Sequence, residues 1–170
     1  MKENSSFSLS WGELDGIRLS PHLASPSAAA LSHSSELDGI RLSPHFLLGE
    51  FLNLKKYPDN IPTFQDIVNL YVGCLFLLEP AREAIGPIII NSGFRNSRVN
   101  HLVGGVANSQ HLVGQAADIR PMNPQQFQRL VDFLKACEYT DQLLTGRDWL
   151  HISWNPFGKP RRQVRIGYYV

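Results

Sequence analysis

The hydrophobic pattern between residues 64 and 84 is that of an amphipathic helix. Apolar side chains recur there every three or four positions, which places them on one face. Thr63, with Asp66 three residues later, resembles a capping box and predicts where the helix begins. Pro80 lies near the other end and predicts a kink there, because proline cannot donate the helical hydrogen bond.

Shorter apolar runs separated by turn residues predict the remaining elements of the domain. Each strand-like run is only a few residues long, as in half-buried strands of a small sheet. We expect strands over residues 87–91, 116–120, 142–144, 149–154 and 163–170, and helices over 96–103 and 123–137. Together these elements predict an α+β fold, in which helices flank a small antiparallel sheet.

The first 41 residues differ from the rest of the chain. They are rich in serine, and the sequence ELDGIRLSPH occurs at residues 13–22 and again at 36–45. Two copies are too few for a solenoid. They indicate either a local duplication or a docking segment present twice. We expect residues 1–41 to form a weakly ordered head and residues 42–170 to form the folded domain.

Composition and charge exclude several classes of protein. Sixteen Lys and Arg residues balance fifteen Asp and Glu residues, so no general affinity for nucleic acid or membrane surfaces is expected. Two cysteines, Cys74 and Cys137, cannot form a disulfide framework, and we expect both to be small buried hydrophobes. No apolar run is long enough to span a bilayer, and the first residues do not resemble a signal peptide.

Two histidines lie near carboxylates at spacings that suggest a metal site. His111 precedes a glycine-containing turn, and Asp118 is expected on the strand that follows it. His151 is expected in the middle of a later strand, three residues after Asp148. Imidazole and carboxylate are good zinc ligands, and three protein ligands plus water form a catalytic site. Any one of these residues alone would more often be an ordinary polar side chain, so the hypothesis depends on the whole pattern.

That pattern resembles the M15 peptidase family, the zinc D-Ala-D-Ala carboxypeptidases and related peptidoglycan endopeptidases. The family motif Ser-x-His-x-x-Gly-x-Ala-x-Asp, followed downstream by an acid, two residues and His, is met at every position. Ser92-Gly93-Phe94-Arg95 also resembles the family's Ser-Gly-Tyr/Phe-Arg element. The resemblance covers about residues 42–155. The segments 46–51 and 78–83 also resemble the compact branch of the family found in phage and bacterial genomes. The motif residues are Ser109, His111, Gly114, Ala116, Asp118, Asp148 and His151.

The resemblance implies a hedgehog/D-Ala-D-Ala-peptidase-like fold and a role for each motif residue. His111, Asp118 and His151 would bind Zn²⁺. Asp148 would be the general acid/base, although other members often have Glu there. Arg95 would face the substrate, where it would bind a carboxylate or polarise the scissile carbonyl. Ser109 would support the site through hydrogen bonds.

The implied activity is zinc-dependent hydrolysis of peptide bonds in peptidoglycan stem peptides, as in endolysins. A D,D-carboxypeptidase that trims terminal D-Ala, or an inactive zinc-containing cell-wall-binding module, are the alternatives. Retention of Asp148 argues against the inactive module, which has no need of that acid. We expect a monomer that is made in the cytoplasm and acts on the cell wall, with phage lysis as one route of release. The basic stretch 159–165 either solvates an edge strand or contacts the anionic wall.

Overall fold

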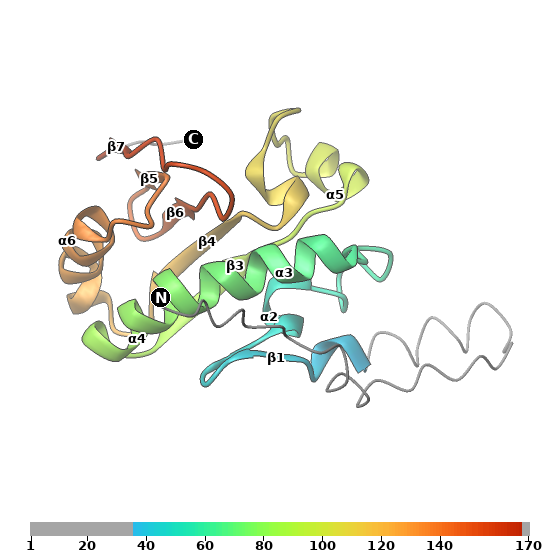
Figure 1. Cartoon of the computed structure of the whole chain (residues 1–170), viewed down its shortest axis with the longest axis horizontal. Coiled ribbons are helices and arrows are strands. Elements are labelled where there is room, and N and C mark those ends of the chain that lie inside the picture. The colour runs from blue at the N-terminus through green and yellow to red at the C-terminus, as the bar shows by residue number, and fades with distance from the viewer. Residues whose placement is uncertain (1–35, 168–170) are drawn as a thin grey trace, which may run out of the picture.

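The computed structural model describes residues 36–167, which form a sheet with helices packed around it (Figure 1). A two-stranded hairpin precedes the main sheet. Its strands are β1 (Arg41–Ser43) and β2 (Phe46–Leu47), followed by the helix α2 (Leu48–Leu52). The other helical elements are α3 (Phe64–Gly73), η1 (Cys74–Leu78), α4 (Glu79–Ile85), α5 (Ser97–Leu102), η2 (Gln110–Val113), η3 (Pro124–Gln126) and α6 (Phe127–Ala136). The predicted α+β class is confirmed.

The main sheet has the strand order β3-β4-β6-β5-β7. The pairs β3–β4, β4–β6 and β6–β5 are antiparallel, as the sequence predicts. The strands are β3 (Ile88–Ser92), β4 (Ala116–Pro121), β5 (Gln142–Thr145), β6 (Leu150–Ser153) and β7 (Gln163–Arg165). Each lies within a residue or two of its predicted position, except that β7 is shorter than the expected 163–170.

The last strand departs from the expected antiparallel arrangement, because β7 runs parallel to β5. The end of β6 lies beside the start of β5, where Ser153 pairs with Gln142. The chain then crosses to the free edge of β5 and enters at that same end, with Gln163 opposite Gln142. A chain that enters an edge beside the first residue of its neighbour must run in the neighbour's direction. The antiparallel prediction for this strand was wrong for that reason.

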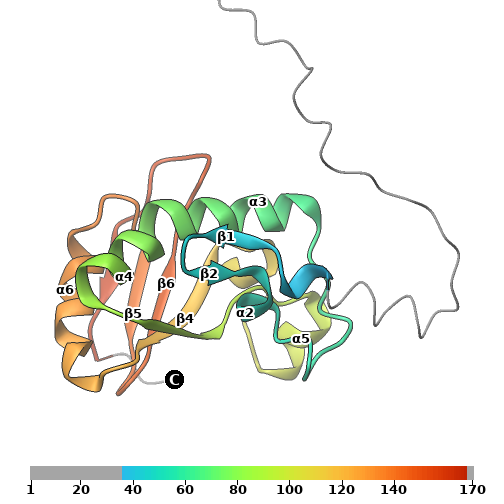
Figure 2. The same cartoon turned by 90° about the horizontal axis from the view of Figure 1, so that it is seen from below.

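The predicted helix over residues 64–84 is present as one continuous helical rod (Figure 2). It begins with the predicted capping box, in which the Thr63 side chain accepts from the Asp66 N–H. Before Pro80 the rod passes through the π-helical turn η1, where the Glu79 N–H donates to the Cys74 carbonyl. Proline disturbs the preceding turn of a helix, and a π turn is one way to absorb the disturbance.

Both cysteines are free and lie on this helical side of the fold. Cys74 is fully buried, and Cys137 is partly buried against the core. Burial raises the pKa of the Cys74 thiol well above its usual range, so a thiolate nucleophile is disfavoured there. Within the described residues, no helix is long and apolar enough to cross a membrane.

The second copy of the repeat is part of the folded domain. Ser43 Oγ donates to Glu79 Oε2 at 2.5 Å, and the His45 N–H and imidazole also contact this carboxylate. Burial raises the pKa of Glu79, but these hydrogen bonds outweigh that effect and hold it below its ordinary value. Leu37 packs against the core, so contacts with the domain begin before the expected boundary at residue 42. The first copy, at residues 13–22, lies outside the described residues.

We expect removal of residues 1–35 to leave the zinc content and the midpoint of urea unfolding unchanged. The serine-rich composition of that segment favours weak packing. Removal of residues 1–41 should lower the midpoint, because it also deletes Leu37 and the Ile40 carbonyl that accepts from the Leu48 N–H at 2.8 Å. Unfolding curves of the full chain and the two truncated chains measure this. If removal of residues 1–35 alone unfolds the protein, that segment belongs to the folded core.

Candidate metal centre

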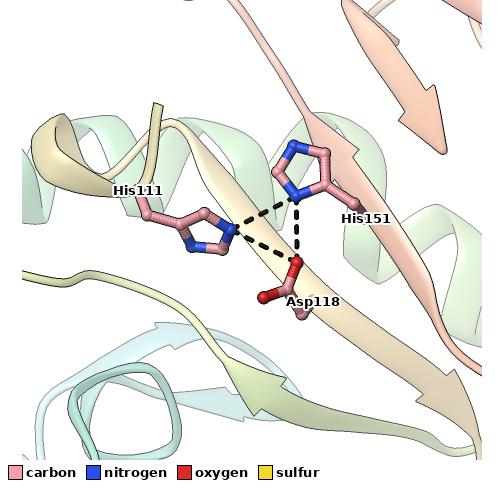
Figure 3. Close-up of side chains that lie close together, drawn as sticks. All are labelled: His111, Asp118 and His151. Atoms are coloured by element: carbon pink, nitrogen blue, oxygen red, sulfur yellow. Dashed lines mark hydrogen bonds and ion pairs between the residues drawn. The ribbon is translucent and has the colours of Figure 1, made fainter. Parts of the chain in front are cut away.

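Three side chains of the predicted zinc site converge in the structure (Figure 3). Nε2 of His111 lies 3.2 Å from Oδ1 of Asp118 and 3.2 Å from Nδ1 of His151. The same Nδ1 lies 2.9 Å from the Asp118 oxygen. His111 is almost fully buried, whereas the other two side chains keep 14–22% of their surface exposed. The three ligand atoms therefore face one point from η2, β4 and β6.

Sheet register and one glycine bring these residues together. Asp118 and His151 are directly opposite each other on β4 and β6, so their side chains leave the sheet on the same face. His111 lies in the short helix η2, which ends at Gly114 with a φ of 65°. A side chain at Gly114 would also meet the Asp66 carbonyl, because an added Cβ would lie 2.4 Å from that oxygen. Glycine is therefore required where the chain turns from His111 into β4.

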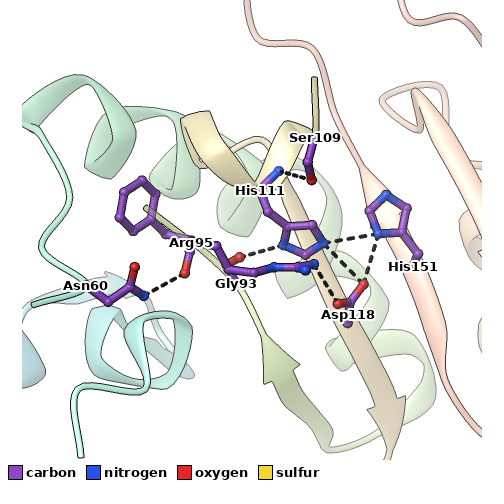
Figure 4. Close-up of polar contacts among 8 residues, drawn as sticks. Asn60, Gly93, Arg95, Ser109, His111, Asp118 and His151 are labelled. Carbon is purple, nitrogen blue, oxygen red and sulfur yellow. Dashed lines mark hydrogen bonds and ion pairs between the residues drawn. The ribbon is translucent and has the colours of Figure 1, made fainter. Parts of the chain in front are cut away.

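A backbone carbonyl fixes the orientation of the buried imidazole (Figure 4). Nδ1–H of His111 donates to the Gly93 carbonyl at 2.5 Å, so Nε2 presents its lone pair to the cluster. Gly93 must approach closely, because an added Cβ would lie 2.5 Å from Cβ of Phe51. Ser109 Oγ accepts from the backbone N–H of His111 at 3.4 Å. Ser109 thus contacts the residue that the sequence predicts it to support.

The electrostatics of the cluster keep the imidazole neutral and the carboxylate charged. Burial lowers the pKa of His111, although the nearby Asp118 acts in the opposite direction. Burial raises the pKa of Asp118, but the two adjacent imidazoles outweigh it and hold that pKa well below the ordinary value. Neutral imidazole and ionised carboxylate are the protonation states in which these groups bind a metal.

The donor set fits a zinc ion. Nε2 of His111 has no proton to donate, and the Asp118 oxygen is an acceptor, yet the two lie 3.2 Å apart. A cation between the two atoms accepts a lone pair from each of them. A hydrogen bond cannot form there because neither atom carries a proton. Two atoms about 2.1 Å from a tetrahedral metal are about 3.4 Å apart, close to the separations seen here. Three protein ligands leave the fourth position for water or substrate, as in catalytic zinc sites.

Arg95 lies beside the cluster and contacts one of its members. Its Nη2 donates to Oδ2 of Asp118 at 3.0 Å, which leaves Oδ1 directed at the two histidines. The loop that carries Arg95 is held by Asn60, which donates to the Phe94 carbonyl at 2.8 Å (Figure 4). Burial lowers the pKa of the guanidinium, and Asp118 partly offsets this. Arg95 therefore orients a predicted zinc ligand while lining the same cavity.

The structure does not bring Asp148 to the cluster. Asp148 is exposed at the tip of the β5–β6 hairpin, where the Gly146 N–H donates to the Trp149 carbonyl. It borders a separate cavity, together with Arg120 and residues of η3 and α6. Trp149 and His151 line the cavity of the cluster, whereas Asp148, in the turn before β6, does not. Asp148 does not line the cavity that contains the cluster, and its acid/base role stays a prediction.

A cavity of about 510 Å³ contains the cluster and includes groups that sequence reasoning missed. Trp149 and Arg161 line it alongside the predicted residues. Arg161 is held there by Asp141 and Gln110. In the sequence, Arg161 is marked only as part of the basic stretch 159–165. That stretch does not indicate which of its residues lines the cavity. Trp149 could have been found from strand alternation, because it lies two residues before His151.

Comparison with known proteins agrees with this site. The family model Peptidase M15 matches residues 62–153, which is more than half of the chain. The chain belongs to the peptidase M15 family, and the resemblance seen in the sequence is confirmed. It is also similar to a zinc D-Ala-D-Ala carboxypeptidase from Streptomyces albus G, with 45% identity over 47 residues. That match covers 26% of this chain and 18% of the relative, so the chain spans about a fifth of that protein's length. Family and relative both indicate Zn²⁺ as the metal.

Proposed function

We propose that the chain is a zinc peptidase that hydrolyses peptide bonds in peptidoglycan stem peptides. The observation that carries the proposal is the His111–Asp118–His151 cluster, whose ligand atoms converge within the cavity of a peptidase M15 member. Bound zinc supplies a Lewis acid that polarises a carbonyl and lowers the pKa of water towards about 7.

The chain's own residues bind and orient the reacting groups. The Gly93 carbonyl holds His111 in one tautomer, and Arg95 holds Asp118 in one orientation, so that the two ligands are fixed before substrate enters. The cationic Arg95 also lines the cavity, where it can stabilise negative charge that develops on a carbonyl oxygen.

Asp148 is the proposed general acid/base on the strength of the family pattern. A carboxylate in that role accepts a proton from water and passes it to the leaving amine. Asp148 is exposed in the hairpin turn and borders a separate cavity, so the proposed role rests on the family pattern alone.

A D,D-carboxypeptidase is the second candidate, and the name of the Streptomyces relative favours it. The two activities differ in the position of the bond that is cut. An endopeptidase cuts an internal bond of a stem peptide or cross-link, whereas a carboxypeptidase releases only the last D-Ala. Either reaction would take place at the cell wall.

Mass spectrometry of purified muropeptides incubated with the zinc-loaded protein tests the proposal. We expect new fragments from internal cleavage, which disappear when zinc is removed with a chelator. Products shorter by a single terminal alanine would assign the carboxypeptidase activity instead. Intact muropeptides after prolonged incubation with fully zinc-loaded protein would contradict both and favour the binding module.

A further inference from the structure

Arg161 belongs to a segment that the family match does not include. The matched region ends at residue 153, and the chain continues through a loop into β7. Arg161 lies in this loop, yet it lines the cavity that contains the histidine–aspartate cluster. The segment beyond the family match therefore contributes a cation to the wall of the candidate active site.

A buried carboxylate holds the Arg161 side chain in one orientation. Asp141, only 2% exposed, accepts from Nε at 2.8 Å and from Nη2 at 2.6 Å, and its other oxygen accepts from the Arg161 backbone N–H. Nη2 also donates to Oε1 of Gln110, the residue before the metal-binding candidate His111. The guanidinium is thus fixed by the same short helix that positions the imidazole, and it loses little freedom on meeting a ligand.

The other edge of the guanidinium remains available. An arginine has five N–H donors, and Nη1 carries two of them. Within residues 36–167, no acceptor lies within hydrogen-bond distance of Nη1, and the side chain is 54% exposed. Arg161 lines the cavity, and its Nη1 is free to donate to a ligand there.

The cavity offers an anionic ligand two guanidiniums beside the metal-binding cluster. Its described lining includes Arg95 and Arg161 and the carboxylate of Asp118, and the buried Asp141 pairs with Arg161. The Asp118 carboxylate is already engaged by Arg95 and both histidines, and a bound zinc adds further positive charge. Arg95 is only 13% exposed, so Arg161 is the more accessible of the two guanidiniums. Guanidinium recognises a carboxylate through charge-assisted hydrogen bonds.

We infer that Arg161 is a specificity-determining residue that binds a carboxylate of the peptide substrate. The inference rests on the proposed function for its choice of a peptide ligand. The carboxylate can come from the end of the peptide or from an acidic side chain. Both sources have the same chemistry, so the ligands in the experiment must separate them.

Three short alanine peptides provide the test: one with a free terminal carboxylate, one with a terminal amide, and one amidated peptide containing a glutamate. The zinc-loaded full chain is compared with Arg161→Gln, with Arg161→Lys and with Arg165→Gln. Arg165 is an exposed cation of the same basic stretch and is the matched control. Because Arg161→Gln leaves Asp141 buried without its cation, the double variant Asp141→Asn/Arg161→Gln is included as a neutral pair. Values of kcat/KM are compared for peptides that are cleaved, and calorimetric Kd values for those that are not.

We expect the parent to prefer a carboxylate-bearing peptide over the neutral amide by about tenfold or more. Arg161→Gln and the double variant should lose this preference, Arg161→Lys should keep part of it, and Arg165→Gln should keep all of it. Preference for the free terminus or for glutamate identifies the source of the carboxylate. The inference is wrong if the parent shows the same kcat/KM or Kd for all three peptides. It is also wrong if the preference for a carboxylate survives in both Arg161→Gln and the double variant. A preference in Kd without any cleavage would uphold it and contradict the proposed peptidase.

Discussion

His151→Ala is expected to cost the protein its zinc. The variant removes one of three converging ligand atoms, the Nδ1 that lies 2.9 Å from Asp118 and 3.2 Å from Nε2 of His111. Loss of a group that merely orients a ligand typically weakens metal binding about 10–100-fold, so loss of a ligand should weaken it by more than about 100-fold. Zinc content after dialysis against a competing chelator, measured by inductively coupled plasma mass spectrometry, gives the result.

His101→Ala is the matched control for this variant. His101 is an exposed histidine at the end of α5, outside the cluster. We expect it to retain zinc at the parental level, which separates loss of a ligand from loss of any imidazole. If His151→Ala held zinc as firmly as His101→Ala, the assignment of His151 as a ligand would be wrong.

Asp148→Asn is expected to lower kcat by about 10²–10⁴-fold while zinc content stays unchanged. The amide is nearly isosteric with the carboxylate but cannot accept a proton. The family pattern gives Asp148 a catalytic role, but in the structure its side chain borders a different cavity. The rate of this variant decides whether the family role applies here. Turnover of muropeptides and zinc content are measured on the same preparation.

Asp132→Asn, on an exposed surface of α6, is the control for a change of charge alone. A parental rate for Asp148→Asn would remove Asp148 from the mechanism. Asp141 and Glu138 are the nearest alternatives in the chain, but neither is placed to act. Asp141 is buried and bound to Arg161, whereas Glu138 borders a separate cavity with Phe76 and Tyr139.

The local elements of the fold were predictable because each has a local cause. The helix start at Thr63 follows from its capping box, and the strands around Asp118 and His151 follow from alternating buried residues. The direction of β7 was not predictable in the same way. It depends on where the chain re-enters the sheet, and the contacts of Asp141 with the Arg161 and Gln163 backbone fix that point.

The metal-binding candidates were predictable because their identities and spacing form one motif. The positions of Arg161 and Asp148 depend on the folded loops around them. Arg161 is held at the cavity by Asp141, which is twenty residues away in the sequence, and by Gln110. Asp148 lies in the turn before β6, where strand alternation does not set the direction of its side chain, and it borders a different cavity. Side chains in turns and crossing loops take their direction from long-range contacts, which a linear pattern does not contain.

The most direct test of the central claim is a crystal of the zinc-loaded protein measured at the zinc absorption edge. We expect one anomalous peak in this cavity, about 2.0–2.2 Å from Nε2 of His111, Nδ1 of His151 and Oδ1 of Asp118. A zinc peak at another place, with these three atoms bound only to one another, would contradict the account.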